Sequence, residues 1–258
     1  MTLTLALDTS TSMTAVALGE IRDEGASLIA ETNLEAPRAA LTHLVPSIMR
    51  LLESSGHVIA DVGAVVVGRG PGSFTGVRIG VATAKGIAQG LGVPLLGVGT
   101  LDAVAERFAL SETLLGVLGD AMRGEVYPAA FDISGGRVDR TGPDEVSSPE
   151  RIAERWSALD RPLLLAGGGL RKYRSVFEDA LGGRAQVAPE SMWAPTGESL
   201  LLAAWRGRAA GTLGDGDPGT LLPVYTRLSD AEETERSRSG RSDSVSDNGV
   251  AGPDPVPR

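Results

Sequence analysis

The chain has 258 residues, of which 42% are hydrophobic and 22% charged, as in an ordinary globular protein. Its net charge of −9, without a Lys/Arg run in its body, argues against a protein that binds nucleic acid by itself, because such proteins usually neutralise phosphates with a basic face. The absence of cysteine excludes disulfides, thiolate zinc sites and cysteine nucleophiles. No signal-peptide pattern is present, and no run approaches the roughly 18 apolar residues of a membrane span. We therefore expect a cytoplasmic protein.

Strands alternate with helices in the first hundred residues, which predicts an α/β domain with a partly parallel sheet. The helix at 39–56 carries an apolar stripe and contains Pro46. The predicted strands lie at Leu3–Thr9, Thr14–Glu20, Ser27–Asn33, Val62–Gly68 and Val93–Val98, and the other helices at Gly76–Leu91 and Leu101–Phe108.

A weaker repeat of the opening begins near residue 114. Residues Leu114–Asp132 again predict a strand, an Asp-containing turn and a second strand, with Asp120 in the place of Asp8. This pattern favours two related lobes, although unrelated hairpins would look the same. A further strand is predicted within 161–169 and a helix at 196–210. We predict an N-terminal lobe at 1–100, a C-terminal lobe at 101–228 and a disordered, Ser-rich charged tail at 229–258.

The segment "GRGPGSFTG" (Gly68–Gly76) looks like a phosphate-binding loop but matches no standard template. It lacks the lysine of a P-loop, has G-x-G-x-G in place of the dinucleotide pattern, and has no G-x-S-x-G nucleophile elbow. Its N–H groups and the following helix dipole can still face an anion. Arg78 lies where the dipole disfavours a cation, so it needs a partner, either an anion or a structural carboxylate. The candidate residues of this loop are Gly70, Gly72, Ser73, Thr75 and Arg78.

Small residues recur every fourth position in the next helix, at Gly76, Gly80, Ala84 and Ala88. Such a smooth face packs closely on the chain's own sheet or on another helix. His43 is predicted on the helix side opposite the stripe of Leu41, Leu44, Ile48 and Leu52, as a surface residue or a partner contact. The two histidines, His43 and His57, are far apart, so the sequence predicts no metal site. Asp8, Thr9 and Ser10 either hydrogen-bond a phosphate or close the hairpin turn.

Three stretches together resemble the TsaB family, formerly YeaZ: "LALDTSTSMTAVAL", "GRGPGSFTGVRIGVATAKGIAQGLGVPLLGVGTLDAVA" and "GDAMRGEVYPAAF". The resemblance is specific from about residue 3 to 131 and thinner to "LLPVYTR" (Leu221–Arg227). It implies the actin-like, sugar-kinase-like (ASKHA) fold, with two lobes that each begin with antiparallel strands. In that superfamily the turn matching Asp8–Ser10 touches nucleotide phosphates. For this chain the resemblance implies no cofactor of its own, with ATP or ADP at the interface of a complex.

The resemblance implies a non-catalytic scaffold and activating subunit of a tRNA-modifying complex. Its catalytic partner TsaD transfers threonylcarbamoyl to the adenosine beside the anticodon of tRNAs that read codons beginning with A. TsaD carries a His-rich metal motif where this chain has "GTLDAVA" (Gly99–Ala105), which argues against catalysis here. TsaE joins the complex, tRNA binds only through it, and two copies of the chain can pair when TsaD is absent. The predicted interface residues are His43, Gly76, Gly80, Thr83, Ala84 and Ile87.

A stand-alone enzyme of the ASKHA superfamily, either a small-molecule kinase or a peptidase, is the alternative function. The missing histidines weigh against a metallopeptidase. Turnover by the isolated chain would favour the kinase.

Overall fold

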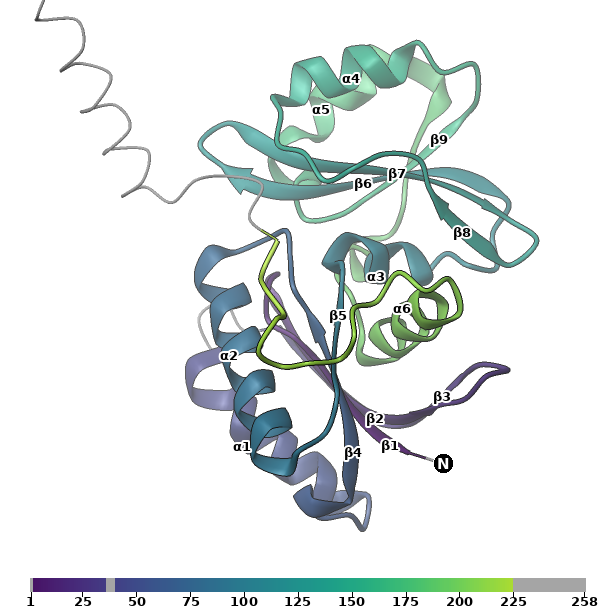
Figure 1. Cartoon of the computed structure of the whole chain (residues 1–258). Coiled ribbons are helices and arrows are strands. Elements are labelled where there is room, and N and C mark those ends of the chain that lie inside the picture. Colours follow the sequence, from purple (N-terminus) through teal and green to yellow (C-terminus); the bar gives the residue numbers. More distant parts are fainter. Residues whose placement is uncertain (1, 36–39, 225–258) are drawn as a thin grey trace, which may run out of the picture. The chain divides into compact units, whose positions relative to one another are not determined.

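In the computed structural model, the chain folds around two five-stranded mixed sheets flanked by helices (Figure 1). The structure describes residues 2–35 and 40–224, so the predicted tail at 229–258 lies outside the described residues. The strands are β1 (Leu3–Asp8), β2 (Met13–Ile21), β3 (Ala26–Glu35), β4 (Val62–Gly68), β5 (Leu95–Val98), β6 (Thr113–Met122), β7 (Glu125–Ser134), β8 (Arg137–Arg140), β9 (Leu163–Ala166) and β10 (Ala185–Val187). The helices are α1 (Ala40–Ser54), α2 (Phe74–Leu91), α3 (Thr100–Glu106), α4 (Pro149–Ser157), α5 (Leu170–Leu181) and α6 (Gly197–Ala209), with 3₁₀ turns at Ile59–Asp61, Gly182–Arg184 and Glu190–Met192.

The first sheet has the strand order β3-β2-β1-β4-β5. Its central strand, β1, pairs antiparallel with β2 and parallel with β4, so Leu7 lies opposite Val16 on one side and Val67 on the other. Both β1 and β4 are apolar and buried, as expected for strands covered by helices on both faces of a sheet. The predicted hairpin at residues 3–20 and the predicted strand at 62–68 are thereby confirmed.

Helices α1 and α2 cover one face of this sheet and α6 covers the other (Figure 1). The apolar stripe of α1 is buried as predicted, since Leu44, Ile48 and Leu52 are each 1% exposed. α2 begins two residues earlier than predicted, because the Ser73 hydroxyl caps its N-terminus by accepting the N–H of Gly76 at 3.3 Å.

The second sheet repeats the first in strand order and direction. Its order is β8-β7-β6-β9-β10, with β6 antiparallel to β7 and parallel to β9. The turns repeat as well: the carboxylates of Asp8 and Asp120 each accept the N–H of the residue two positions on, at 2.6 and 2.9 Å. The prediction of two related lobes, each with a mixed sheet opened by an antiparallel hairpin, is confirmed. The chain thus has the two-lobe ASKHA-like α/β fold.

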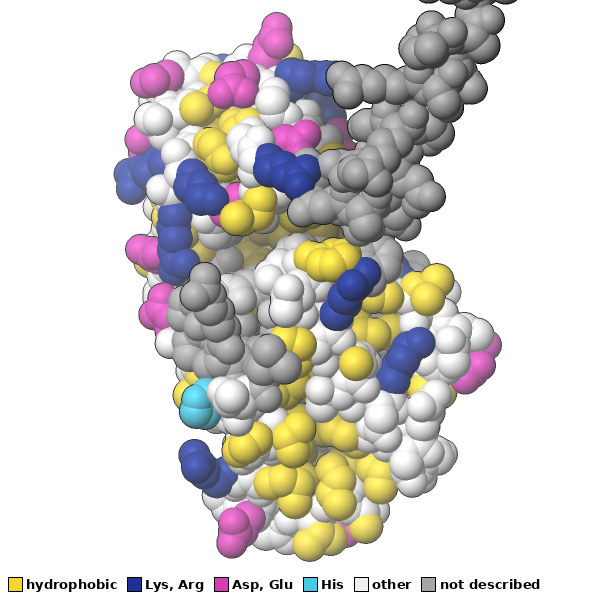
Figure 2. All heavy atoms as spheres, turned by 90° about the vertical axis from the view of Figure 1, so that its left-hand side faces the viewer, with side chains coloured by type: hydrophobic (Ala, Val, Ile, Leu, Met, Phe, Trp, Pro, Cys, Tyr) yellow, Lys and Arg dark blue, Asp and Glu magenta, His cyan; other side chains and the backbone are white. Residues whose placement is uncertain are grey.

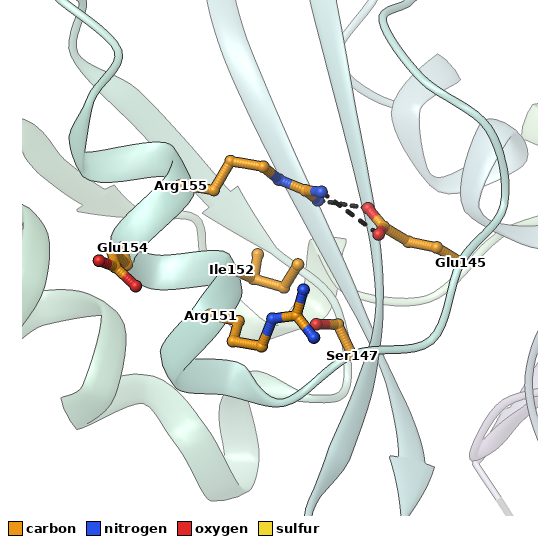
Figure 3. Close-up of a pocket in the computed structure, with 6 residues that line it drawn as sticks. All are labelled: Glu145, Ser147, Arg151, Ile152, Glu154 and Arg155. Carbon is orange, nitrogen blue, oxygen red and sulfur yellow. Dashed lines mark hydrogen bonds and ion pairs between the residues drawn. The ribbon is translucent and has the colours of Figure 1, made fainter.

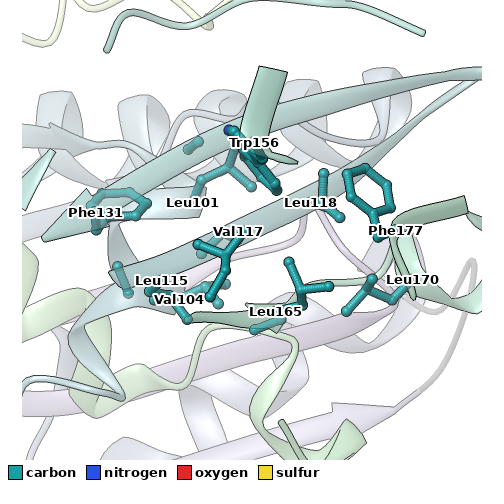
Figure 4. Close-up of a cluster of buried hydrophobic side chains, with 14 of the residues drawn as sticks. Leu101, Val104, Leu115, Val117, Leu118, Phe131, Trp156, Leu165, Leu170 and Phe177 are labelled. Carbon is teal, nitrogen blue, oxygen red and sulfur yellow. The ribbon is translucent and has the colours of Figure 1, made fainter. Parts of the chain in front are cut away.

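The core of the second lobe is a cluster of buried apolar side chains around β6 (Figure 4). Trp156 of α4 and Phe177 of α5 pack on one face of the sheet, with their ring centroids 5.6 Å apart. Leu101 and Val104 bring α3 into the same cluster. Helical patterns were expected on both sides of the strand at 161–169, where α4 and α5 lie, but the bounds of these helices and the strands β8 and β10 were not predicted.

The predicted C-terminal lobe at 101–228 needs one correction. α6 packs on β1, β2 and β3 of the first sheet, and Gly197 allows this approach, since a Cβ there would lie 2.3 Å from the Cβ of Ala17. Downstream of α6, the carbonyl of Gly216 accepts the Leu95 N–H at 2.9 Å. The second lobe therefore ends near residue 187, and residues 197–224 return to the first. None of the helices in the described residues is long and apolar enough to cross a bilayer.

Candidate functional site

The glycine loop between β4 and α2 closes over the turn of the first hairpin. The Ser73 N–H donates to the Ser10 carbonyl at 2.7 Å. A Cβ on Gly72 would lie 2.4 Å from that same carbonyl oxygen, and Gly70 has a φ of +93°, so both positions require glycine. The loop that resembles a phosphate cradle is thus in contact with the chain's own main chain.

Asp8 is the centre of a buried hydrogen-bond network at the carboxyl end of β1. Its Oδ1 accepts the N–H and the hydroxyl of Ser10 at 2.6 and 2.7 Å, and its Oδ2 accepts the hydroxyl of Thr100 at 2.7 Å. Burial raises the pKa of Asp8, and the hydrogen bonds from Thr100 and Ser10 oppose that shift. A Cβ on Gly68 would lie 1.7 Å from Oδ2, so the network leaves room only for glycine there.

Thr9 joins this turn to α2. Its buried hydroxyl donates to the Gly76 carbonyl at 2.5 Å. A Cβ on Gly76 would lie 2.0 Å from the Thr9 carbonyl oxygen, and one on Gly80 would lie 2.6 Å from the Thr9 hydroxyl. Ala84 and Ala88 continue the same face and are fully buried. The small-residue face of α2 therefore packs on the first lobe's own sheet.

The predicted partner interface is corrected accordingly. Gly76, Gly80 and Ala84 face inward and offer no surface to another protein, because the hairpin turn and sheet already occupy that side of α2. His43 is exposed on α1, and Thr83 and Ile87 are half-buried on α2. That these three residues contact a partner stays a prediction.

The candidate phosphate contacts at the first hairpin turn are turned inward. Asp8, Thr9 and Ser10 are at most 3% exposed, and their polar side-chain atoms are hydrogen-bonded within the chain. A nucleotide phosphate contact at this turn would need those internal bonds to break. Such a contact stays a prediction.

The first turn of α2 holds the remaining candidates for anion contact. Ser73 caps the helix, and Thr75 is exposed. Arg78 was expected to need a partner near the positive end of the helix dipole, and its guanidinium lies 3.7 Å from the ring centroid of Phe74. This cation–π contact supplies one partner. An anion at this turn stays a prediction.

The outer sides of α1 and α2 form an apolar surface. Val45, Met49 and Phe74 are 55%, 49% and 43% exposed. Figure 2 shows apolar side chains gathered over the lower part of this face, among few charged ones. Contiguous exposed apolar patches mark interaction sites. We call this region the α1–α2 surface, and it comprises His43, Val45, Met49, Phe74, Thr83 and Ile87.

Ion pairs anchor α3 between the two lobes. Glu106 is buried and accepts the Arg206 Nε of α6 at 2.8 Å, while Asp102 pairs with Arg140 of β8 at 2.9 Å. Burial raises the pKa of Glu106, and the charge and hydrogen bond of Arg206 oppose that shift.

Residues Gly99–Ala105, where the resemblance implied a comparison with a metal motif, do not offer free ligands for a metal. The Asp102 carboxylate is paired with Arg140, and the Thr100 hydroxyl is bonded to Asp8. His57 lies elsewhere, beside Asp61, with Nδ1 3.6 Å from the carboxylate. Across residues 2–35 and 40–224, no three His, Cys, Asp or Glu side chains are grouped so as to hold a metal ion.

A shallow pocket lies on the second lobe beside α4 (Figure 3). Its volume is about 230 Å³, and an ion pair between Arg155 and Glu145 spans one side of it. The other lining residues are Ser147, Arg151, Ile152 and Glu154. The mixture of opposite charges does not select a ligand class.

Sequence reasoning missed two parts of these sites. Thr100 lies two residues after the end of β5, so its position at the carboxyl edge shared with Asp8 was a usable signal. Val45 and Met49 are spaced i, i+4 outside the buried stripe of α1, a pattern that signals a second apolar face.

Comparisons with known proteins agree with this geometry. The family model described as "TsaD: tRNA N6-adenosine threonylcarbamoyltransferase" matches residues 34–233. A Bacillus subtilis "tRNA threonylcarbamoyladenosine biosynthesis protein TsaB" is 30% identical over 228 residues, which cover 88% of this chain and 95% of that protein. The Escherichia coli protein of the same description is 35% identical, with 68% and 75% covered. The solved structure "YeaZ from Pseudomonas aeruginosa" has a TM-score of 0.72 and 32% identity, covering 87% of this chain and 100% of its own.

Proposed function

Because the chain belongs to the TsaB family, we propose that it serves tRNA threonylcarbamoyladenosine biosynthesis as a non-catalytic subunit that binds and activates TsaD. The relatives of this description match over most of their length, which supports the assignment to that process. The match to the TsaD family model supports an evolutionary link to the catalytic subunit itself.

The α1–α2 surface is the observation that carries the binding proposal. Two neighbouring helices expose large apolar side chains, including Val45 and Met49, that a protein working alone would tend to bury. An apolar core with polar residues around it is the usual anatomy of a protein–protein interface. His43 and Thr83 supply polar groups beside the apolar ones.

The chemistry of the chain supports the proposal of an accessory rather than a catalytic role. The sequence has two histidines and no cysteine, and the polar groups at the carboxyl end of β1 are hydrogen-bonded to one another.

Within this proposal TsaE joins the TsaD-bound complex, tRNA binds through the complex, and ATP or ADP lies at its interface. When TsaD is absent, a second copy of the chain covers the same surface.

Reconstitution tests the proposed function. The chain is added to TsaD, TsaE and the enzyme that forms threonylcarbamoyl-AMP, and threonylcarbamoyladenosine in tRNA is measured by mass spectrometry. We expect product with the chain present and little without it, and none from the chain with the adenylate-forming enzyme alone. Equal product with and without the chain would overturn the proposal. Turnover of ATP or a peptide by the isolated chain would favour the stand-alone enzyme instead.

A further inference from the structure

Arg69, the residue that follows β4, is partly exposed, but its Nε is buried and has no hydrogen-bond partner in the described part of the chain. No carboxylate of the residues that the structure describes lies within 4.0 Å of the Arg69 guanidinium nitrogens. A buried donor on a charged group is unfavourable unless something accepts its hydrogen bond.

The position of Arg69 is well determined by its surroundings. Its N–H donates to the Val98 carbonyl at 2.9 Å, and its own carbonyl accepts the Val224 N–H at 2.8 Å. The side-chain stem lies along Gly97 of β5, where a Cβ would be 3.1 Å from the Arg69 Cδ and 2.7 Å from the Leu221 Cδ1. The stem therefore runs between β5 and the returning segment at 221–224.

Other arginines of the chain show what a half-buried guanidinium normally does. Arg140 and Arg206 pair with carboxylates, and Arg184 donates to main-chain carbonyls at 2.5 and 2.9 Å. Arg151, which like Arg69 has no side-chain partner among residues 2–35 and 40–224, is exposed, so water can satisfy it. Arg69 differs in combining burial of its Nε with the lack of an acceptor.

We propose that Arg69 receives a carboxylate side chain of the partner protein, an inference that rests on the proposed binding of TsaD. The Nε and one terminal nitrogen of a guanidinium form a fork that matches the two oxygens of a carboxylate. The groups that hold the Arg69 side chain are apolar or main-chain, so the site offers one positive charge, which one carboxylate balances.

The affinity of the full-length chain for TsaD tests this pairing. Truncating one member of a desolvated charge pair weakens binding strongly, so we expect Arg69→Gln to raise the Kd at least about tenfold. Arg69→Lys keeps the charge but loses the fork, and recovers only part of the affinity. Arg151→Gln removes the same charge from the other lobe and leaves the Kd unchanged. Wild-type affinity in both Arg69 variants would overturn the pairing, whereas failure of the wild-type chain to bind TsaD would overturn the proposed function.

Nuclear magnetic resonance of the Arg69 Nε–H supplies a second measurement. Its signal is identified by its disappearance in Arg69→Gln. We expect TsaD to shift this signal and to slow its exchange with solvent, because a carboxylate then accepts the proton. A signal unchanged in the TsaD complex would overturn the inference. A signal that moves with ATP in the isolated chain, and does not move with TsaD, would overturn it in favour of a phosphate ligand.

Discussion

The Thr9 hydroxyl donates a 2.5 Å hydrogen bond to the main-chain carbonyl of Gly76, 67 residues away in the sequence. This bond brings the turn of the first hairpin against the first turn of α2. Glycines in α2 are needed for that approach, because a Cβ at Gly76 or Gly80 would collide with Thr9. The segment that resembles a phosphate cradle thus holds two parts of one lobe together.

Alanine substitutions along α2 test this close approach. We expect Gly80→Ala to lower the free energy of unfolding by about 1–3 kcal/mol, because the added methyl group would lie 2.6 Å from the Thr9 hydroxyl. Gly86→Ala is the matched control: it is exposed in the same helix, and no atom lies within 4 Å of the added Cβ. It should raise stability by about 0.5–1 kcal/mol, as alanine does in helices. Equal urea midpoints for the two variants would contradict the packing.

The pH dependence of stability tests the burial of Asp8. Because burial raises its pKa above 3.8, the folded chain holds this proton at pH values where the unfolded chain has released it. The stability of the wild type relative to Asp8→Asn, which cannot ionise, should therefore be greater near pH 4 than at pH 7. Urea unfolding at both pH values measures this difference. Thr100→Val removes a hydrogen bond that opposes the shift, so it should raise the Asp8 pKa further. A stability difference between the wild type and Asp8→Asn that does not change with pH would show that folding leaves the Asp8 pKa unshifted.

Much of the fold was predictable because its signals are local. The stripe of Leu44, Ile48 and Leu52 and the apolar run at Val62–Gly68 each identify an element and its buried side. The inward direction of Gly76 and Gly80 was not predictable, since a smooth helix face suits a sheet and a partner helix equally. Only the distance from Thr9, a contact between segments far apart in sequence, decides between them. The same holds for the return of α6 to the first sheet and for the lack of an acceptor at the Arg69 Nε.

A charge introduced on the α1–α2 surface tests its role in binding. We expect Met49→Asp to weaken binding to TsaD at least about tenfold, because an apolar side chain at the centre of an interface contributes more than 1.4 kcal/mol. Its melting temperature should change little, since Met49 is 49% exposed in the free chain. Leu110→Asp, at a site that is 99% exposed away from these helices, is the control and should bind normally. Normal binding by Met49→Asp would exclude this part of α1 from the interface.

The ion pair between Glu106 and Arg206 should make the stability of the chain depend on pH. Glu106 is only 4% exposed at its side chain, and Arg206 is 26% exposed. Burial already raises the pKa of Glu106, and Arg206→Met removes the charge that opposes this shift, so the pKa should rise further. At pH 7 the variant should lose about 1–3 kcal/mol of stability, because a buried carboxylate is left without its partner. The loss should shrink as pH falls through the raised pKa, since a protonated Glu106 needs no counter-charge.

The double variant with Glu106→Gln should be less destabilised than the sum of the two single changes. Urea unfolding between pH 5 and pH 7 measures all three variants, and a loss that is additive and independent of pH would show that the two side chains do not act as a pair.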